Sequence, residues 1–356
     1  MRAAAGAKRL LTAFGLAVFL ASAAPAAAAP SVEPEAWDAW RASFLDASGR
    51  VVDTGNNGIS HSEGQGYGLL LAVLAEDRET FERIWSFTRT ELLLRDDGLA
   101  AWRWSPSEEP RVTDMNDASD GDILIAYALG RAGKAWDRPD LTQAGAAMAE
   151  AIGSHLLFTQ EGRTLLRPAA AGYDRGDRPD GPVVNLSYWV FEAFPVLAEL
   201  APGHDWAGAE AGGRALLASV LAEGSLPPEW LSVARRPRPA EGFPAEFGYN
   251  ALRVPLYLLR AAPGDEAERA RLAALAAAMT DPDTGAVRLV DLASGATKER
   301  LTDPGYRILP AAVACAQGGT PLPDDLKRYA STLYYPSTLH LLTLAHLKEE
   351  HPGCLR

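Results

Sequence analysis

The amino-acid sequence predicts an all-α protein whose helices pair into hairpins and close into a toroid. Apolar residues recur at helical spacing through much of the chain, and sustained alternation of the strand kind is scarce. Twelve segments carry the helical pattern, and twelve helices that each bury one face can form six hairpins around a ring. No fixed repeat length occurs, which argues against a regular solenoid.

The first 29 residues are typical of a secretory signal peptide. A basic N-terminal stretch precedes an apolar segment from Leu10 to about Ala21. Small residues follow up to Ala29 and offer several cleavage sites of the A-x-A type. The apolar segment is short for a bilayer, which favours cleavage over a retained amphipathic or membrane-spanning helix. No later segment is apolar enough to span a membrane. We therefore expect export, to the periplasm or out of the cell, and no membrane insertion after cleavage.

Residues 30–356 are expected to form a single catalytic domain, because no interior stretch resembles a flexible linker. The formal net charge of the whole chain is -12, and the loss of Arg2, Lys8 and Arg9 would make it -15. Such an acidic chain is a poor partner for nucleic acid or anionic lipid, whereas a neutral polymer would not be repelled. A monomer is expected.

The cysteines and histidines indicate neither a disulfide scaffold nor a metal site. Cys315 and Cys354 could form one bridge in an oxidising compartment, and the sequence leaves this pairing open. Cys354 lies in the segment "HPGCLR", which is expected to fray. The six histidines are scattered and no CxxC or HExxH motif occurs, so the usual metal ligands are missing. We expect no metal and no other cofactor.

The predicted helices are separated by loops of very different length. Their approximate ranges are 35–47, 62–77, 79–94, 119–135, 139–157, 185–201, 206–222, 248–262, 265–279, 305–317, 323–332 and 336–349. Three loops are long and rich in Pro and Gly: "RWSPSEEPRVTDMND", "RPAAAGYDRGDRPDGPVV" and "SVARRPRPAEGFPAEFG". Long loops in a compact domain are functional or disordered, and the aromatic and charged residues of these three favour function.

One carboxylate stands among glycines at the start of the second predicted helix. The stretch "SHSEGQGYG" places Glu63 directly before the apolar run "LLLAVLA". A charge that favours the helix N-terminus is the ordinary explanation for such a residue. The three nearby glycines, however, would allow the close backbone approach that a ligand needs. The stretch is not a phosphate loop, because it lacks the Lys-Ser/Thr ending and the spacing of a dinucleotide turn.

Several acids crowd the start of the predicted helix 119–135. Asp114, Asp117, Asp120 and Asp122 lie within "DMNDASDGD". Their negative charges repel one another unless the carboxylates bind a cation, cap a helix or act together in one function. The stretch fails as an EF-hand loop, because Ser119 stands where glycine is required. Capping by Ser119 or Asp117 would explain only one of these residues.

A pair of carboxyl groups would account for both motifs. Glycoside hydrolysis needs one protonated acid and one ionised partner on opposite sides of a sugar. A helix N-terminus keeps Glu63 ionised, so its service as an acid requires desolvation or a close carboxylate such as Asp120. The hypothesis fails if the carboxyl oxygens of Glu63 and Asp120 lie farther than about 10 Å apart.

Flat aromatic side chains would provide stacking platforms for the apolar faces of sugar rings. The candidates are Trp102, Trp104, Tyr188, Trp189, Trp230, Tyr334 and Tyr335. Core packing is the alternative for each of them. The apolar surroundings of Trp189 favour core packing, whereas the polar loop beside Trp102 favours a platform.

At "SEGQGYG" and "ASDGDILIAYAL" the chain resembles glycoside hydrolase family 8, the cellulase D family. The likeness extends to "AWRW", "NLSYW", "PPEW" and "YNALRVPLYL" in the family's order, and so covers nearly the whole mature chain. It is nearest to the bacterial endoglucanases encoded with cellulose synthase, particularly those of the rhizobial type. The resemblance implies an (α/α)6 barrel with an open cleft that hydrolyses internal β-1,4 links with inversion.

The resemblance also implies roles for individual residues. Glu63 matches the family's general acid. Asp120 matches the signature aspartate, which is assigned either as nucleophile or as a residue that grips the sugar at the cleavage point. Tyr188 and Arg253 match residues that position the attacking water, and Trp102 or its neighbour Trp104 matches a stacking platform.

One position departs from the family pattern. Many members have Asp, the general base, where "YNALR" has Asn250. A neutral amide oxygen is too weak a base to take a proton from water, so Asn250 can only orient it. Either another carboxylate is the base, with Asp120 first and Asp122, Asp117 or Glu246 behind it, or the enzyme is slow. Asn250 and Asp122 are predicted to be substrate-binding residues.

The sequence therefore predicts an exported endo-β-1,4-glucanase that trims cellulose-like chains without a cofactor. A role beside a cellulose synthase, in the cell's own cellulose production, is a further expectation. Two alternatives stay open. Asn250 motivates a degenerate hydrolase fold that binds β-glucan without cutting it, and a chitosanase or xylanase of the same family would also suit an acidic cleft.

Overall fold

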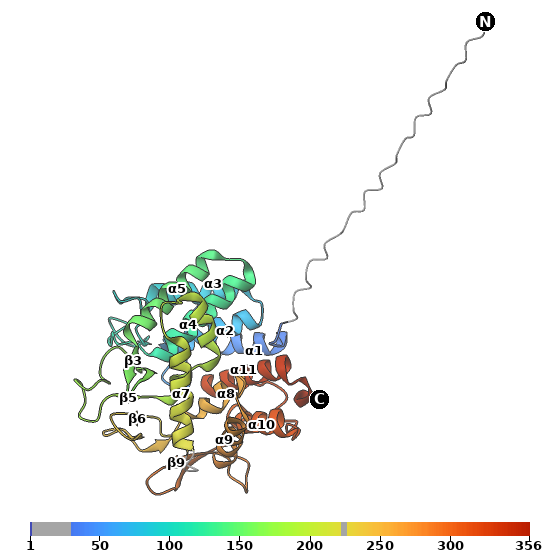
Figure 1. Ribbon diagram of the computed structural model, residues 1–356. Helices are drawn as coiled ribbons and strands as arrows, with labels where there is room; N and C mark the ends of the chain where they lie inside the picture. The colour runs from blue at the N-terminus through green and yellow to red at the C-terminus, as the bar shows by residue number, and fades with distance from the viewer. Residues whose placement is uncertain (2–29, 222–225) are drawn as a thin grey trace.

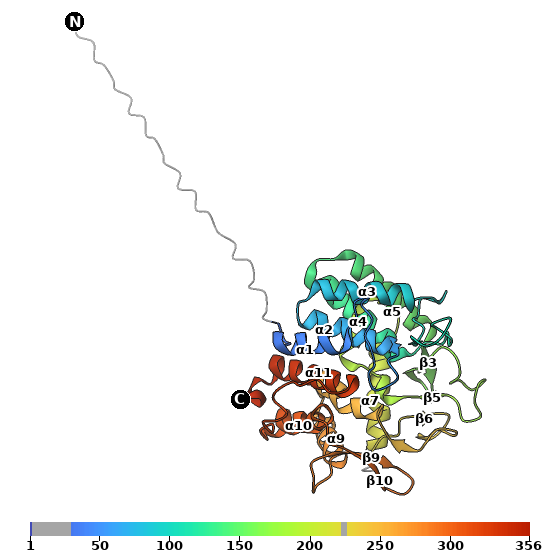
Figure 2. The same ribbon diagram turned by 180° about the vertical axis from the view of Figure 1, so that it is seen from behind.

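The computed structural model describes Met1 and residues 30–221 and 226–356, so the expected signal peptide, except for Met1, lies outside the described residues. In the described part of the chain, eleven α-helices alternate with loops and short strands (Figures 1 and 2). The predicted all-α fold class is confirmed. None of the helices within these ranges is long and apolar enough to cross a membrane.

The most deeply buried helices occupy the centre of the ring. Nearly every residue is buried in α2 (Ser62–Leu74) and α4 (Ser119–Trp136), which pack against each other. α8 (Val254–Arg260) and α11 (Tyr334–Glu350) are also largely buried, and α11 contacts both α2 and α10 (Pro304–Gly318). Helices that are apolar on most of their circumference need neighbours on all sides.

The helices of the outer layer bury one face each. They are α1 (Pro34–Phe44), α3 (Arg78–Glu91), α5 (Pro139–His155), α7 (Trp206–Leu221) and α9 (Glu266–Ala278). In α3 the buried residues include Phe81, Ile84, Trp85 and Thr88, which is the spacing of one helical face. The short α6 (Phe194–Leu200) packs against α4, α5 and α7.

Three of the predicted helices differ from the structure. Residues 323–332 form turns and no helix; only Leu326 is buried there, so a helix would have almost no apolar face to pack. Residues 185–201 contain two 3-10 turns, η1 (Leu186–Tyr188) and η2 (Phe191–Ala193), before α6. Residues 248–262 begin with η3 (Ala251–Arg253) before α8. Both α-helices begin where a proline occupies the first turn, since proline lacks the N–H that a longer helix would need.

Short antiparallel strands, which the sequence pattern did not predict, organise the long loops. β1 (Ser60–His61) pairs with β2 (Arg103–Trp104), and this joins the Glu63 segment to the first long loop. β5 (Val183–Val184), β6 (Leu231–Ser232) and β7 (Arg238–Pro239) tie the second long loop to the third. β3 (Leu157–Gln160), β5 and β6 lie on one side of the helices in both views (Figures 1 and 2).

Two further strand groups complete the described fold. β3 (Leu157–Gln160) and β4 (Arg163–Leu166) form a hairpin. β8 (Glu246–Phe247), β9 (Val287–Asp291) and β10 (Thr297–Leu301) form a three-stranded sheet in the order β10-β9-β8. Because β8 belongs to the third long loop, this sheet anchors the chain just before Asn250.

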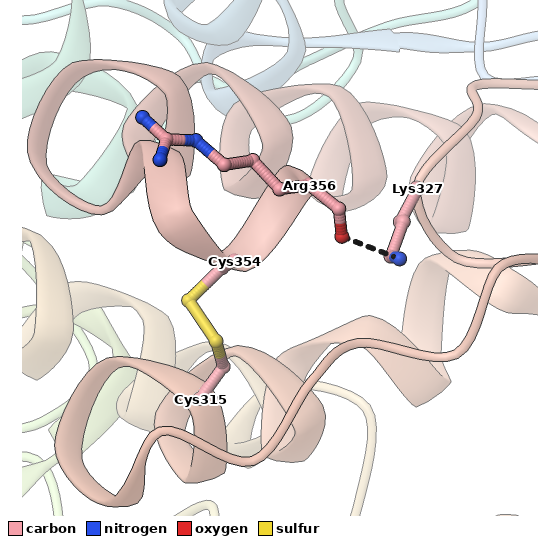
Figure 3. Close-up of a disulfide and its surroundings, with 4 residues drawn as sticks. All are labelled: Cys315, Lys327, Cys354 and Arg356. Carbon is pink, nitrogen blue, oxygen red and sulfur yellow. Dashed lines mark hydrogen bonds between the residues drawn. A yellow bond between two sulfur atoms is a disulfide. The ribbon is translucent and has the colours of Figure 1, made fainter.

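The two cysteines form a disulfide that fastens the C-terminus (Figure 3). Cys315 lies on α10 and Cys354 lies in η4 (Pro352–Leu355), with their Cα atoms 5.9 Å apart. Lys327 Nζ also donates a hydrogen bond to the backbone oxygen of Arg356 at 2.8 Å. The expectation that "HPGCLR" frays is therefore wrong, since Cys354 is buried and bonded.

Replacing both cysteines by serine is expected to lower the free energy of unfolding by about 3 kcal/mol, because a bridge across 39 residues restricts the unfolded chain. Thermal unfolding of wild type and of the Cys315→Ser, Cys354→Ser variant measures the loss. Reduced wild type is the control and should unfold with the variant. Equal melting temperatures for oxidised wild type and variant would contradict the expectation.

Candidate active site

Glu63 lies in the first turn of α2, and a histidine caps that helix. His61 Nδ1 accepts a hydrogen bond from the backbone N–H of Gly64 at 2.9 Å, and its Nε2 lies 3.3 Å from Asp53 Oδ2. Because Nδ1 accepts, the neutral ring carries its proton on Nε2 and donates it to Asp53. The side chain of Glu63 is 17% exposed, so it is neither sealed in the core nor free in solvent.

The glycines around Glu63 serve helix packing. A Cβ at Gly66 would lie 2.5 Å from the Cβ of Leu124 on α4, and one at Gly68 would lie 2.7 Å from Cγ2 of Val51. These contacts are closer than side chains tolerate, so glycine is needed for α2 to approach its neighbours. The prediction that these glycines admit a ligand is wrong, because protein atoms occupy the space.

Arg253 brings the two predicted carboxylates together. Its Nη1 lies 2.6 Å from Glu63 Oε2 and 3.0 Å from Asp120 Oδ2. The two oxygens can therefore be no farther apart than the sum of those distances, about 5.6 Å, which is inside the 10 Å limit set above. Arg253 is 1% exposed, and one buried cation thus offsets two acids that would otherwise repel.

The other end of the same guanidinium holds the segments that follow the long loops. Arg253 Nη2 donates to Ser187 Oγ at 3.1 Å and to Asn250 Oδ1 at 3.3 Å. The guanidinium carbon lies 5.6 Å from the ring centre of Tyr188, which is half-buried. The structure thus gathers five predicted site residues from four segments: Glu63, Asp120, Tyr188, Asn250 and Arg253.

Asp120 has an unusual protonation equilibrium. Burial, followed by the negative charge of Glu63, raises the pKa of its carboxyl to about 7, although the positive charge of Arg253 acts in the opposite direction. Its Oδ1 also accepts a hydrogen bond from the backbone N–H of Gly121 at 2.8 Å. The carboxyl therefore exchanges a proton near neutral pH.

This equilibrium predicts a pH-dependent stability. Between about pH 4 and pH 7 the folded protein keeps a proton on Asp120 that the unfolded chain has released, so this contribution falls as pH rises, by up to about 4 kcal/mol. Asp120→Asn removes the titration. Urea unfolding from pH 4 to 8 should therefore show wild type losing stability relative to the variant up to about pH 7. If the free energies of unfolding of wild type and Asp120→Asn changed in parallel with pH, the raised pKa of Asp120 would be contradicted.

The other predicted carboxylates lie away from this centre. Asp122 is fully buried and its Oδ1 accepts the backbone N–H of Ala100 at 2.8 Å, which is an internal position and not the substrate contact expected. Asp117 is also buried and accepts the backbone N–H of Ala170 at 2.9 Å. Glu246 pairs with Lys298 on the surface of the third loop.

The aromatic candidates separate into core and surface residues. Trp102 is half-buried, and its Nε1 donates to Asp114 Oδ2 at 2.8 Å. Trp104 instead packs between Arg50 and Arg111, whose guanidinium carbons lie 4.9 and 5.6 Å from its ring centre. Trp102 is thus the more available platform of the two.

The remaining aromatic candidates pack against other protein groups. Trp189 and Tyr334 are fully buried, so core packing is their role in the structure. Trp230 stacks with Tyr173 and Phe243 at ring-centre distances of 5.3 and 4.6 Å. Tyr335 is half-buried and donates a hydrogen bond to the backbone oxygen of residue 249 at 2.8 Å.

A cavity of about 420 Å³ opens beside Glu63 and Arg253. Sequence reasoning missed several of its wall residues: Asp53, His61, Tyr249 and Tyr306. His61 in "SHSEGQGYG" and Tyr249 in "YNALRVPLYL" belong to motifs quoted above, where Glu63 and Asn250 drew the attention; Asp53 and Tyr306 belong to no motif. A larger hollow of about 600 Å³ lies at Arg238 and Arg288, away from the carboxylate pair. In the described ranges, no three His, Cys, Asp or Glu side chains are arranged to hold a metal ion.

Comparisons with known proteins bear on the family of the chain and on its fold. A family model described as glycosyl hydrolases family 8 matches residues 7–349. A probable endoglucanase of Novacetimonas hansenii is 38% identical over 299 residues, which are 82% of this chain and 85% of the relative. An endoglucanase of Cellulomonas uda is 34% identical over 226 residues, which are 63% of this chain and 62% of the relative. The endo-beta-1,4-glucanase CMCax from Acetobacter xylinum matches with a TM-score of 0.77 and 35% identity, over 90% of this chain and 99% of that one.

Proposed function

Because the chain belongs to glycosyl hydrolases family 8, we propose that it cuts internal β-1,4 links of cellulose-like glucan with inversion at the anomeric carbon. The membership confirms the resemblance drawn from the sequence motifs and, with it, the six-hairpin (α/α)6 architecture. The enzyme class is that of a glycoside hydrolase acting on cellulose.

One observation carries the proposed mechanism: Glu63 and Asp120 meet at a single arginine nitrogen beside a cavity. Glu63 donates a proton to the leaving glycosidic oxygen.

The Asp120 oxygen that contacts Arg253 lies closer to its Glu63 counterpart than the usual spacing of an inverting pair. Carboxyls of an inverting pair lie about 6.5–9.5 Å apart, because a water must fit between one of them and the sugar. The oxygens of Glu63 and Asp120 that contact Arg253 are at most about 5.6 Å apart. We therefore assign Asp120 to holding the sugar at the cleavage point, while Tyr188, Asn250 and Arg253 position the attacking water.

The setting of the reaction belongs to the same proposal. A signal peptide over residues 1–29 would export the enzyme to the periplasm or beyond, where it would act as a monomer on β-1,4-glucan. Work beside a cellulose synthase, trimming newly made chains, fits this location and the neutral substrate.

The test is a product profile on carboxymethylcellulose, mixed-linkage glucan, xylan and chitosan, with the configuration of the new reducing end followed by NMR. The expected result is release of internal fragments from the β-glucans with the α-anomer formed first. A β-anomer would mean retention and would make Asp120 the nucleophile. Binding without cleavage by wild type would favour the alternative motivated by Asn250, a β-glucan-binding protein.

A further inference from the structure

We infer that Glu229 is the general base of the proposed hydrolysis. The inference rests on the proposed function and names the group that the Asn250 amide leaves missing. Inversion requires a carboxylate that takes a proton from the attacking water, on the side of the sugar opposite the acid. Neither the sequence motifs nor the comparisons assign this role to Glu229, which stands in "PPEW".

Glu229 is held directly against Asn250. Its Oε1 accepts the backbone N–H of Asn250 at 2.6 Å, and its own backbone N–H donates to the carbonyl of Glu246 at 3.1 Å. A Cβ at Gly248 would lie 2.6 Å from Oε1 and 3.4 Å from Oε2. A larger residue at Gly248 would have to displace this carboxylate, so the segment before Asn250 packs directly against it.

Glu229 and the acid are linked to different nitrogens of Arg253. Glu63 contacts Nη1 of Arg253, whereas Asn250 contacts Nη2, at the other end of the guanidinium. Glu229 is linked to Nη2 only through Asn250, whose backbone N–H donates to Glu229 and whose Oδ1 accepts from Nη2. The proposal requires a water between Glu229 and the sugar, on the side away from Glu63.

The other candidate bases fail on position. Asp120 shares an arginine nitrogen with the acid, Asp117 and Asp122 are buried and bonded to loop backbone, and Glu246 is paired with Lys298. Glu229 is half-buried, and its carboxyl faces both the backbone N–H and the side chain of Asn250. Burial raises the pKa of its carboxyl, although the N–H of Asn250 acts in the opposite direction, and a higher pKa makes a carboxylate a stronger base.

The step balances without a further reactant. The water oxygen bonds to C1 while the bond from C1 to the leaving oxygen breaks. Glu63 gives its proton to the leaving oxygen, and Glu229 Oε2 takes a proton from the water, directly or through one more water. Asn250 orients the attacking water. After the step, Glu63 regains a proton from solvent and Glu229 releases one to solvent.

Glu229→Gln tests the assignment. The amide oxygen of Gln can still accept the N–H of Asn250, so the fold should persist, which thermal unfolding checks. We expect kcat on an aryl cello-oligosaccharide to fall at least about 100-fold with little change in KM.

Azide attacks the sugar without help from a base, so adding it to Glu229→Gln should restore turnover and yield the α-glycosyl azide. Adding Asn250→Asp to Glu229→Gln should also restore part of kcat. Glu241→Gln, an exposed carboxylate on the same loop, is the control and should match wild type.

Two results would overturn the role of Glu229. One is a Glu229→Gln variant whose kcat stays within about threefold of wild type, since loss of a general base costs far more. The other is a large loss of kcat that neither azide nor Asn250→Asp relieves, which would mean a structural role. If wild type and Glu241→Gln were both inactive on every β-glucan, the proposed function would be refuted. An active wild type with an equally active Glu229→Gln variant would refute only the role of Glu229.

Discussion

Glu63→Gln is expected to lower kcat on soluble β-1,4-glucan by about 1000-fold or more, because the variant lacks the acid proposed to protonate the leaving oxygen. The amide has nearly the same shape as the acid and keeps the contact with Arg253. Affinity for cello-oligosaccharides should therefore remain near that of wild type. Reducing-sugar release and isothermal titration calorimetry measure the two quantities separately.

The leaving group provides a second measurement on Glu63→Gln. A leaving group of low pKa needs no proton, so the loss of kcat should shrink on a dinitrophenyl substrate. The matched control is Glu79→Gln, an exposed glutamate in the first turn of α3, which shares the helix position and lies outside the cavity. An equal loss of kcat on both kinds of substrate would contradict the acid assignment.

Arg253→Met is expected to remove nearly all activity and to lower the free energy of unfolding by about 3–5 kcal/mol near pH 8, because Glu63 and Asp120 then lose their shared cation. The loss should be smaller near pH 5. There Asp120 keeps its proton, since burial already raises its pKa to about 7 and removal of Arg253 raises it further. Urea unfolding at both pH values measures the effect.

Two further variants separate the electrostatic cause from a packing defect. Adding Asp120→Asn to Arg253→Met should recover part of the lost stability at pH 8, because one unpaired charge is gone. Arg260→Met is the matched control: Arg260 is likewise buried and pairs with Glu192, outside the cavity. It should reduce stability while leaving kcat of the folded protein unchanged. A loss for Arg253→Met that is the same at pH 5 and pH 8 would exclude the carboxylate explanation.

Most helices could be predicted from the sequence because helical periodicity is local. The ranges of α2, α3, α4, α5, α9 and α11 lie within a few residues of those predicted. The prediction over 323–332 is wrong, since a polar segment with one buried leucine lacks a face to pack. The short strands were not predicted, because Val183 and Ser232, for example, pair across loops far apart in the chain.

The candidate site was only partly accessible to sequence reasoning. Motifs singled out Glu63, Asp120 and Arg253, and the structure brings these three together. Their catalytic roles stay predictions. Glu229 was overlooked because its motif, "PPEW", drew attention to the neighbouring tryptophan, and no spacing rule links Glu229 to Asn250, 21 residues away.

The linear order of residues determined where helices form, which segments carry unusual acids, and which family the motifs resemble, because each of these depends on neighbours within a few turns of chain. Only the tertiary structure decided which charges meet at Arg253, that Asp122 is internal, that the cysteines pair, and that a glutamate lies against Asn250. These are contacts between distant segments, and their strength depends on burial, which local sequence does not specify.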